Sequence, residues 1–219
     1  MIRILIIVFL LFPFTVDAAR SRRQSNRRNT TRVAPLKPKV LLDPGHGGDD
    51  FGTKVGSCIE KNVNLKTAEY VAALLRKKGY DVQFTRKKDV FVSLQDRVEI
   101  ANQSKCKIMV SIHFNAAQSK EAEGLEIFYF KDPMIERKDC SKNLADAVMR
   151  GSLQTTNAKS RGVKTGNFCV IRDTLVPSIL VEGGFLTNER ELAKIRQDAY
   201  LRSLAQGIVD GIESYFEKK

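Results

Sequence analysis

Two histidines and two glutamates have the residue types and spacing to form a hydrolytic metal site. The chain contains only two histidines, His46 and His113, and each lies where a short apolar run ends. Glu60 follows a glycine-rich stretch at the expected start of a helix, and Glu182 directly follows the apolar run 179–181. Two imidazoles and one carboxylate can hold zinc and leave its fourth position open for water, and a second carboxylate can serve as general base.

Strand-like apolar runs alternate with helix-like stretches from residue 39 onward. The expected strands cover residues 40–42, 80–85, 107–114, 124–130, 167–171 and 178–181. The expected helices cover about 60–78, 93–104, 137–157 and 198–216. This alternation predicts a single α/β domain over residues 39–219, in which helices cover both faces of a mostly parallel sheet of about six strands.

Such a sheet would bring the four chemical residues to one edge. In open α/β sheets, ligands bind beyond the carboxyl ends of the strands, and the following helices start at the same edge. We therefore expect His46, Glu60 and His113 to meet there as metal ligands, with Glu182 beside them as a base. A plainer interpretation stays open, in which each histidine is a hydrogen-bonded structural residue and Glu60 only caps its helix.

The first eighteen residues have the features of a secretory signal peptide. Arg3 precedes an unbroken apolar run of eleven residues from Ile4 to Phe14, and Ala18 supplies a small residue at the expected cleavage site. An uncleaved membrane anchor is disfavoured because a membrane-spanning helix needs about 20 apolar residues. We expect an exported protein, and we favour the periplasm over full secretion.

The formal net charge of +12 is concentrated near the N-terminus. Residues 20–39 contain eight Arg or Lys and no Asp or Glu, which predicts a basic disordered arm at 19–38. Nucleic acid is not the expected partner, since the arm lacks aromatic residues for base stacking and follows an export signal. An anionic membrane or wall polymer is the expected partner, and a solvated linker without a partner is the alternative.

The four cysteines have no spacing typical of a zinc finger. They are Cys58, Cys106, Cys140 and Cys169. In an oxidising compartment they can form up to two disulfides, or they can stay buried as free thiols. The sequence leaves both possibilities open.

Four short segments around the chemical residues carry a more specific signal. They are Leu42-Asp43-Pro44-Gly45-His46-Gly47-Gly48, Glu60 with Asn64-Leu65, Ser111-Ile112-His113-Phe114-Asn115-Ala116, and Val181-Glu182-Gly183-Gly184-Phe185-Leu186-Thr187-Asn188. Together they resemble the zinc-dependent N-acetylmuramoyl-L-alanine amidases, in order, over residues 39–217.

The resemblance implies a role for each of the four residues. His46, Glu60 and His113 match the residues that hold one zinc ion in that family, and Glu182 matches its catalytic glutamate. The implied substrate is peptidoglycan or a muropeptide, cut between N-acetylmuramic acid and L-alanine of the stem peptide. This activity serves cell-wall remodelling, cell separation or recycling, and we expect a monomer.

One departure from some family members concerns an inserted helix that plugs the zinc site until an activator removes it. Here the interval between the expected strands 124–130 and 167–171 holds one helix and a short connection, so we expect activity without an activator. Asn115 and Arg172 are further candidates for orienting substrate. An Asx-type turn and a surface salt bridge are their respective alternatives.

Two other functions are compatible with these residues. A zinc carboxypeptidase that trims the stem peptide would use the same ligands and base, because the metal chemistry is not specific to one amide bond. A non-catalytic wall-binding protein is the second alternative. It is disfavoured because all four chemical positions hold residues that can do the work.

Overall fold

Strand-forming apolar runs meet in one sheet in the computed structural model, which describes residues 37–131 and 135–218. The sheet has the strand order β4-β1-β5-β8-β6-β7. Its strands are β1 (Lys37–Pro44), β4 (Tyr80–Phe84), β5 (Ile108–Asn115), β6 (Leu125–Tyr129), β7 (Ser160–Thr165) and β8 (Ser178–Phe185). A separate two-stranded ribbon consists of β2 (Lys54–Val55) and β3 (Cys58–Ile59).

Four strands of the sheet are parallel to one another. β1 pairs with β4 and β5, and β5 pairs with β8, all in parallel. β6 is antiparallel to β8, and β7 is parallel to β6. The expectation of one α/β domain with a mostly parallel sheet of about six strands is confirmed for the described residues.

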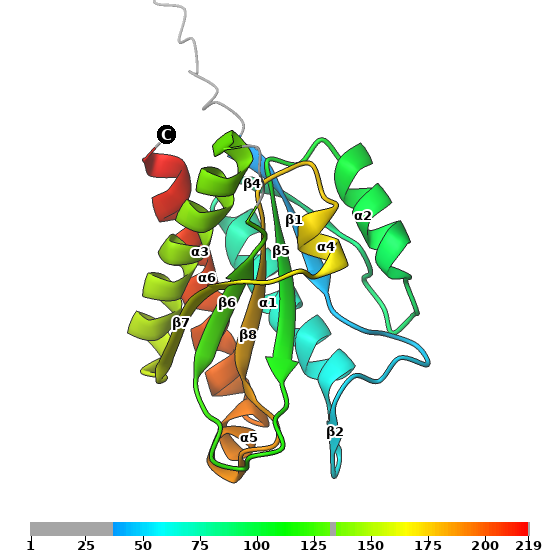
Figure 1. Cartoon of the computed structure of the whole chain (residues 1–219), viewed down its shortest axis with the longest axis vertical. Helices are drawn as coiled ribbons and strands as arrows, with labels where there is room; N and C mark the ends of the chain where they lie inside the picture. The colour runs from blue at the N-terminus through cyan, green and yellow to red at the C-terminus, as the bar shows by residue number, and fades with distance from the viewer. Residues whose placement is uncertain (1–36, 132–134, 219) are drawn as a thin grey trace, which may run out of the picture. The chain divides into compact units, whose positions relative to one another are not determined.

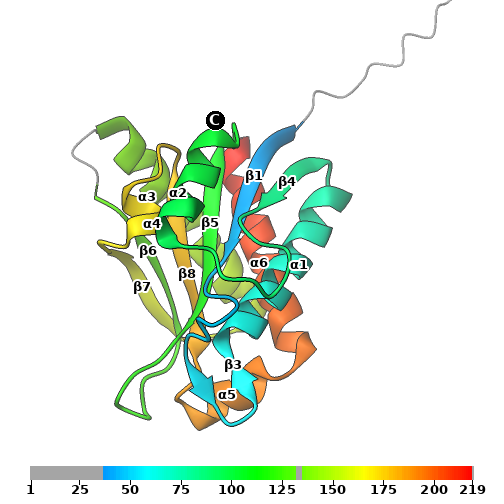
Figure 2. The same ribbon diagram turned by 90° about the vertical axis from the view of Figure 1, so that its right-hand side faces the viewer.

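Helices cover both faces of the sheet, as Figures 1 and 2 show. They are α1 (Glu60–Lys77), α2 (Leu94–Gln103), α3 (Ile135–Thr156), α4 (Cys169–Arg172), α5 (Glu189–Ile195) and α6 (Asp198–Glu217). α1 and α3 pack on one face, with α6 between them, whereas α2 and α4 pack together on the other face. α5 follows β8.

The alternation of side chains along each strand divides the core between these two faces. In β1, Val40 and Leu42 enter the larger cluster under α1, α3 and α6, whereas Leu41 enters the smaller cluster under α2 and α4. In β5, Val110 lies in the larger cluster and Met109 in the smaller one. The inner strands are therefore buried on both sides, which fixes the register that sets the position of their ends.

One strand assignment from the sequence is wrong. We expected a strand at 167–171, but Cys169–Arg172 is the short helix α4, and the strand of that region is Ser160–Thr165, β7. The short apolar run Val170-Ile171 is buried as one helical turn against α2, and periodicity alone cannot separate such a turn from a strand. β7 lies at the edge of the sheet and is largely solvent-accessible, so its sequence is polar.

Two expectations concern residues that the structure does not describe. The signal peptide at 1–18 and the basic arm at 19–38 lie outside the described residues, except for the last two positions of the arm, which start β1. Among the helices at 37–131 and 135–218, none is both long and apolar enough to span a bilayer.

All four cysteines are free thiols, with Cys58 and Cys106 buried.

Candidate metal centre

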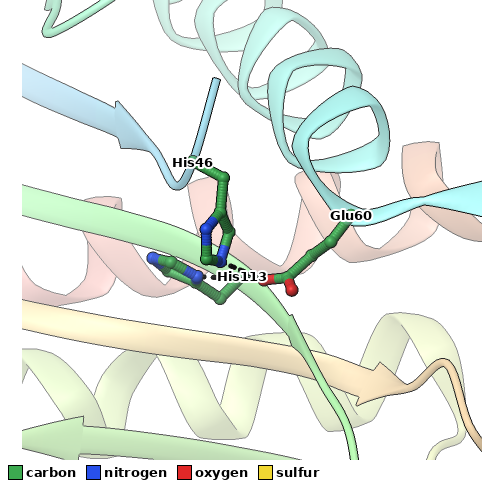
Figure 3. A group of neighbouring side chains, drawn as sticks. All are labelled: His46, Glu60 and His113. Atoms are coloured by element: carbon green, nitrogen blue, oxygen red, sulfur yellow. Dashed lines mark hydrogen bonds and ion pairs between the residues drawn. The ribbon is translucent and has the colours of Figure 1, made fainter. Parts of the chain in front are cut away.

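Three side chains that are far apart in sequence converge at the carboxyl edge of the sheet, and Figure 3 shows their arrangement. Nε2 of His46 lies 3.1 Å from Oε1 of Glu60, and Nδ1 of His113 lies 3.0 Å from the same oxygen. The three ligand atoms lie within 4.8 Å of one another. The expected meeting of His46, Glu60 and His113 is thus present, and each arrives from a different element.

The loop after β1 delivers His46 by a tight backbone path. His46 itself has a positive φ of 61°, which is unfavourable for a residue with a Cβ atom. Gly45 is required because a Cβ there would lie 2.0 Å from Cε1 of His113. Gly52, with φ of 62°, makes a similar close approach, since a Cβ would lie 2.6 Å from Oε2 of Glu60. The glycines therefore make room for the three ligand side chains.

Glu60 is the first residue of α1, as expected, and its carboxylate is only 5% exposed. Oε2 accepts a hydrogen bond of 2.8 Å from the Thr53 amide, so Oε1 is left to face the two histidines. Burial alone would raise the pKa of Glu60, but the hydrogen bonds with His113 and His46 outweigh it and hold the pKa far below its ordinary value. The carboxylate is therefore ionised, as a metal ligand must be.

Asp50 orients the ring of His46 from the opposite side. Nδ1 of His46 lies 2.8 Å from both carboxylate oxygens of Asp50. Burial would lower the pKa of His46, but hydrogen bonds with Glu60 and Asp50 outweigh it and raise the pKa. A carboxylate that holds one ring nitrogen leaves the other, Nε2, directed at the ligand position. The sequence analysis did not single out Asp50, although it is only four residues from His46.

Glu182 lies beside the three converging residues, on the neighbouring strand. In the parallel pairing of β5 with β8, Glu182 is directly opposite His113. Burial, together with the negative charges of Glu60 and Glu126, raises the pKa of Glu182 well above its ordinary value. Oε2 of Glu182 is buried and has no hydrogen-bond partner among the described residues. Such an unsatisfied buried oxygen is costly unless a ligand or water completes it.

Glu126 lies across from Glu182 on the other side and was not predicted. The antiparallel pairing of β6 with β8 places the two residues opposite each other. The carboxylate of Glu126 accepts hydrogen bonds from Arg161 (3.0 Å) and Lys164 (2.5 Å) on β7, and from Nδ2 of Asn115 (2.5 Å). Burial would raise the pKa of Glu126, but these partners hold it below its ordinary value, so a fixed negative charge lies next to Glu182.

A cavity of about 440 Å³ opens beside His46 and His113, between the α2 and α4 regions. Its apolar lining includes Phe91, Leu94 and Phe168, all of which are exposed to solvent. Arg172, one of the candidates for orienting substrate, lines this cavity and forms a two-point ion pair with Asp173.

Asn115, the other candidate, does not line this cavity. Its amide Nδ2 donates to Glu126, and its Oδ1 accepts a hydrogen bond of 2.8 Å from the Ala116 amide. This bond reaches the next residue, whereas an Asx-type turn would bond the amide two residues on. The structure thus places Arg172 near the histidines and turns the Asn115 side chain toward Glu126.

The residues present fit a zinc ion. The donor set of two imidazoles and one ionised carboxylate is a hydrolytic zinc set. Asp50 supplies the carboxylate–histidine contact that commonly orients a zinc ligand. Glu182, whose buried Oε2 has no hydrogen-bond partner among the described residues, is paired with His113 in the sheet.

Residues 40–214 match the family model described as N-acetylmuramoyl-L-alanine amidase. The chain belongs to this family. Among curated relatives, this amidase-family chain is 36% identical over 186 residues to a probable cell wall amidase, LytH, of Staphylococcus epidermidis, with 83% of the chain and 60% of the relative covered. It is 37% identical over 177 residues to the N-acetylmuramoyl-L-alanine amidase LytC of Bacillus subtilis, with 81% of the chain and 35% of LytC covered. The match thus spans less than two thirds of the length of LytH and about a third of that of LytC.

Solved structures of the family have the same fold. An N-acetylmuramoyl-L-alanine amidase from Clostridium difficile 630 is 39% identical, with a TM-score of 0.79, and the match covers 84% of this chain and 99% of that one. The catalytic domain of CwlV from Bacillus (Paenibacillus) polymyxa is 35% identical, with a TM-score of 0.76, covering 84% and 100%. The CwlD amidase of Clostridioides difficile, solved in complex with the GerS lipoprotein, is 29% identical, with a TM-score of 0.79 and the same coverage.

Proposed function

We propose that this amidase-family chain is a zinc-dependent hydrolase that cuts the amide bond between N-acetylmuramic acid and L-alanine of the peptidoglycan stem peptide. The observation that carries this proposal is the convergence of His46, Glu60 and His113 beside the buried, unpartnered carboxylate of Glu182. The choice of substrate rests on family membership. The residues alone do not identify it, because the same metal chemistry can hydrolyse more than one kind of amide bond.

One zinc ion would be held by Nε2 of His46, Nδ1 of His113 and Oε1 of Glu60. Bound there, zinc would supply Lewis-acid polarisation of the scissile carbonyl and would lower the pKa of its bound water to about 7. Asp50 accepts a hydrogen bond from Nδ1–H of His46, which keeps the proton on Nδ1 and leaves Nε2 free as a ligand atom. Glu60 is anchored by the Thr53 amide and cannot swing away from the histidines.

Glu182 is the general base and then the general acid. Its Oε2 takes a proton from the attacking water and passes it to the nitrogen of L-alanine as the C–N bond breaks. This role needs a carboxylate oxygen that is not already hydrogen-bonded to the protein. Among the described residues, Oε2 has no hydrogen-bond partner. It also needs a position beside the ligands, and the pairing with His113 supplies this.

The cavity beside His46 suits an uncharged part of the substrate. The two arginines in its lining are already paired, Arg97 with Asp43 and Arg172 with Asp173. The exposed side chains of Phe91 and Phe168 provide apolar contact surface on its walls. We propose that one flank of the scissile bond, in polymeric wall or a small muropeptide, lies along this surface.

We also propose that the chain works without an activator. The helix in the interval after β6 is α3, which packs against α6 so closely that a Cβ at Gly151 would lie 2.3 Å from the Gly207 carbonyl oxygen. That position is away from the ligand residues. The purified chain should hydrolyse muropeptides alone, and activity that required a second protein would refute this part of the proposal.

We also propose that the protein is exported and acts outside the cytoplasm. The LytH relatives are named cell wall amidases, which supports action outside the cytoplasm, and we favour the periplasm. Cell fractionation with an antibody against the chain tests this, and recovery only in the cytoplasmic fraction would contradict it. We propose anionic membrane or wall polymer, not nucleic acid, as partner of the arm, and a monomeric enzyme.

Metal removal tests the zinc requirement. The purified chain is stripped with a chelator and then titrated with zinc while muropeptide hydrolysis and bound zinc are both measured. The proposal predicts that activity returns with one zinc per chain. His46→Ala, Glu60→Ala and His113→Ala should each lose zinc as well as activity. Full activity of the stripped chain would overturn the proposal.

A further inference from the structure

Two buried arginines hold the loop that carries His46. Arg97 donates from Nη2 to the His46 carbonyl (2.7 Å) and from Nη1 to the Pro44 carbonyl (2.8 Å). Arg86 donates from Nε to Pro44 (2.9 Å) and from Nη2 to the Gly45 carbonyl (2.9 Å). Three consecutive carbonyls of the loop are thus fixed by two guanidinium groups, and only Arg97 bonds to His46 itself.

Asp43 holds Arg97 in place from the end of β1. Its Oδ1 lies 2.7 Å from Nη1 of Arg97, and the two side chains are 1% and 3% exposed. The same carboxylate accepts hydrogen bonds from the hydroxyls of Thr85 (2.6 Å) and Ser111 (2.7 Å). β1, α2, β5 and the residue after β4 therefore contribute to one buried, fully paired group. Buried charges persist in proteins when they are paired in this way.

The position of Arg97 is set by the start of α2. The hydroxyl of Ser93 accepts a hydrogen bond from the Asp96 amide (3.1 Å) and caps the helix, so Arg97 lies in its first turn. Nε of Arg97 also donates to the Val92 carbonyl (3.0 Å), just before the cap. The guanidinium thus links the α2 start to the His46 loop through a fixed fork of donors.

We propose that Arg97, with Asp43 as its counter-ion, is a positioning residue for the metal ligand His46. The inference rests on the proposed function in one respect, namely that His46 holds zinc. His46 adopts a left-handed backbone conformation, and the bond from Arg97 to its carbonyl holds that conformation in place. The imidazole therefore points to Glu60 before any metal arrives, which lowers the ordering cost of zinc binding.

Arg97→Lys tests this with the charge opposite Asp43 retained. An ammonium group lacks the planar fork and cannot reach the Val92, Pro44 and His46 carbonyls together. Because partners of metal ligands typically contribute 10–100-fold to metal affinity, we expect zinc affinity to fall by about that factor. Zinc affinity is measured on the full chain by competition with a coloured chelator, beside circular dichroism and thermal unfolding.

Leu144→Ala is the matched control for lost stability. Leu144 is fully buried in α3, against the α6 side of the core, and touches none of the proposed ligands. It should lower the unfolding temperature and leave zinc affinity unchanged. The proposal is overturned if Arg97→Lys binds zinc within twofold of wild type, or if the two variants lose zinc affinity in proportion to their lost stability.

A milder pair serves if Arg97→Lys does not fold. Ser111→Ala removes one hydroxyl from Asp43, whereas Ser152→Ala removes a buried hydroxyl from α3. We expect Ser111→Ala to lower zinc affinity by about three- to tenfold and Ser152→Ala to leave it unchanged. Equal affinities in the pair would overturn the inference. A wild-type chain that binds no zinc would instead overturn the proposed function, so the two failures are distinguishable.

Discussion

Glu182 lies directly opposite His113 in the parallel pairing of β8 with β5. Neighbouring strands lie about 4.8 Å apart, and the side chains of paired residues share one face of the sheet. The proposed base and one proposed zinc ligand are therefore held at a fixed separation by backbone hydrogen bonds. The sheet register, which the buried strands determine, brings this proposed base and proposed ligand together.

Replacing Glu182 by glutamine should separate zinc binding from catalysis. Glu182→Gln keeps the shape of the side chain but cannot accept the proton of the attacking water. We expect the variant to retain one zinc per chain and to lose about 10²–10⁴-fold in kcat. Zinc content and muropeptide hydrolysis measured on the same sample check this, and loss of zinc would show that Glu182 has a different role.

The same variant should be more stable than wild type when zinc is absent. Burial raises the pKa of Glu182, so folding favours its neutral form. Stability is then greatest below the ordinary glutamate pKa of about 4.3 and falls as the pH rises through the higher folded-state value. We predict that the zinc-free Glu182→Gln variant unfolds at a higher temperature near neutral pH, and that the gap closes on acidification. A constant gap from pH 4 to 8 would contradict this.

Asp43 should make the protein sensitive to acid. Burial would raise its pKa, but the charge of Arg97 and the hydrogen bonds from Thr85, Arg97 and Ser111 outweigh it and hold the pKa low. The stabilising contribution is present above the ordinary aspartate pKa of about 3.9 and is lost as the pH falls through the lower folded-state value. Calorimetry should show a steep loss of stability below about pH 4, and Asp43→Asn should have a shallower slope there. Parallel slopes would argue against the pairing.

Gly45→Ala should damage the metal site more than the fold. The new Cβ would lie 2.0 Å from the ring of His113, so the ring must move out of reach of Glu60. We expect zinc binding to be lost. Gly79→Ala is the control, because its Cβ meets nothing within 4 Å although the backbone φ is positive. It should lose about 1 kcal/mol of stability and keep zinc. Equal zinc affinities in the two variants would refute this reading of Gly45.

The inner half of the sheet and the meeting of the three proposed ligands follow from the sequence because they depend on buried strands. Apolar runs at 40–42, 107–114 and 178–181 predict strands that need two covered faces, and the ends of these strands carry the chemical residues. The convergence of His46, Glu60 and His113 is then a matter of topology. The same pattern fails for β7 and α4. β7 is an edge strand with a polar sequence, and α4 is a single helical turn with an apolar sequence, so α4 was predicted as the strand.

The supporting polar residues could not be predicted in the same way. Asp50 contacts the ring of His46 and Arg97 contacts its carbonyl, and neither contact has a periodic signal in the sequence. Glu126 depends on the antiparallel register of β6 against β8, which no local sequence feature determines. These residues are found only once the backbone path between β1 and α2, and the order of strands, are known.

The bond that is cut tests the account most directly. The purified, zinc-loaded chain is incubated with a muropeptide of defined structure, and the products are identified by mass spectrometry beside a Glu182→Gln control. We predict a free peptide that begins with L-alanine, together with the muramic-acid saccharide, and neither product from the control. Release of only the terminal D-alanine would identify a stem-peptide carboxypeptidase and contradict the proposed amidase. No product from the wild-type chain would contradict activity without an activator, and would indicate either an activator-dependent enzyme or a wall-binding protein.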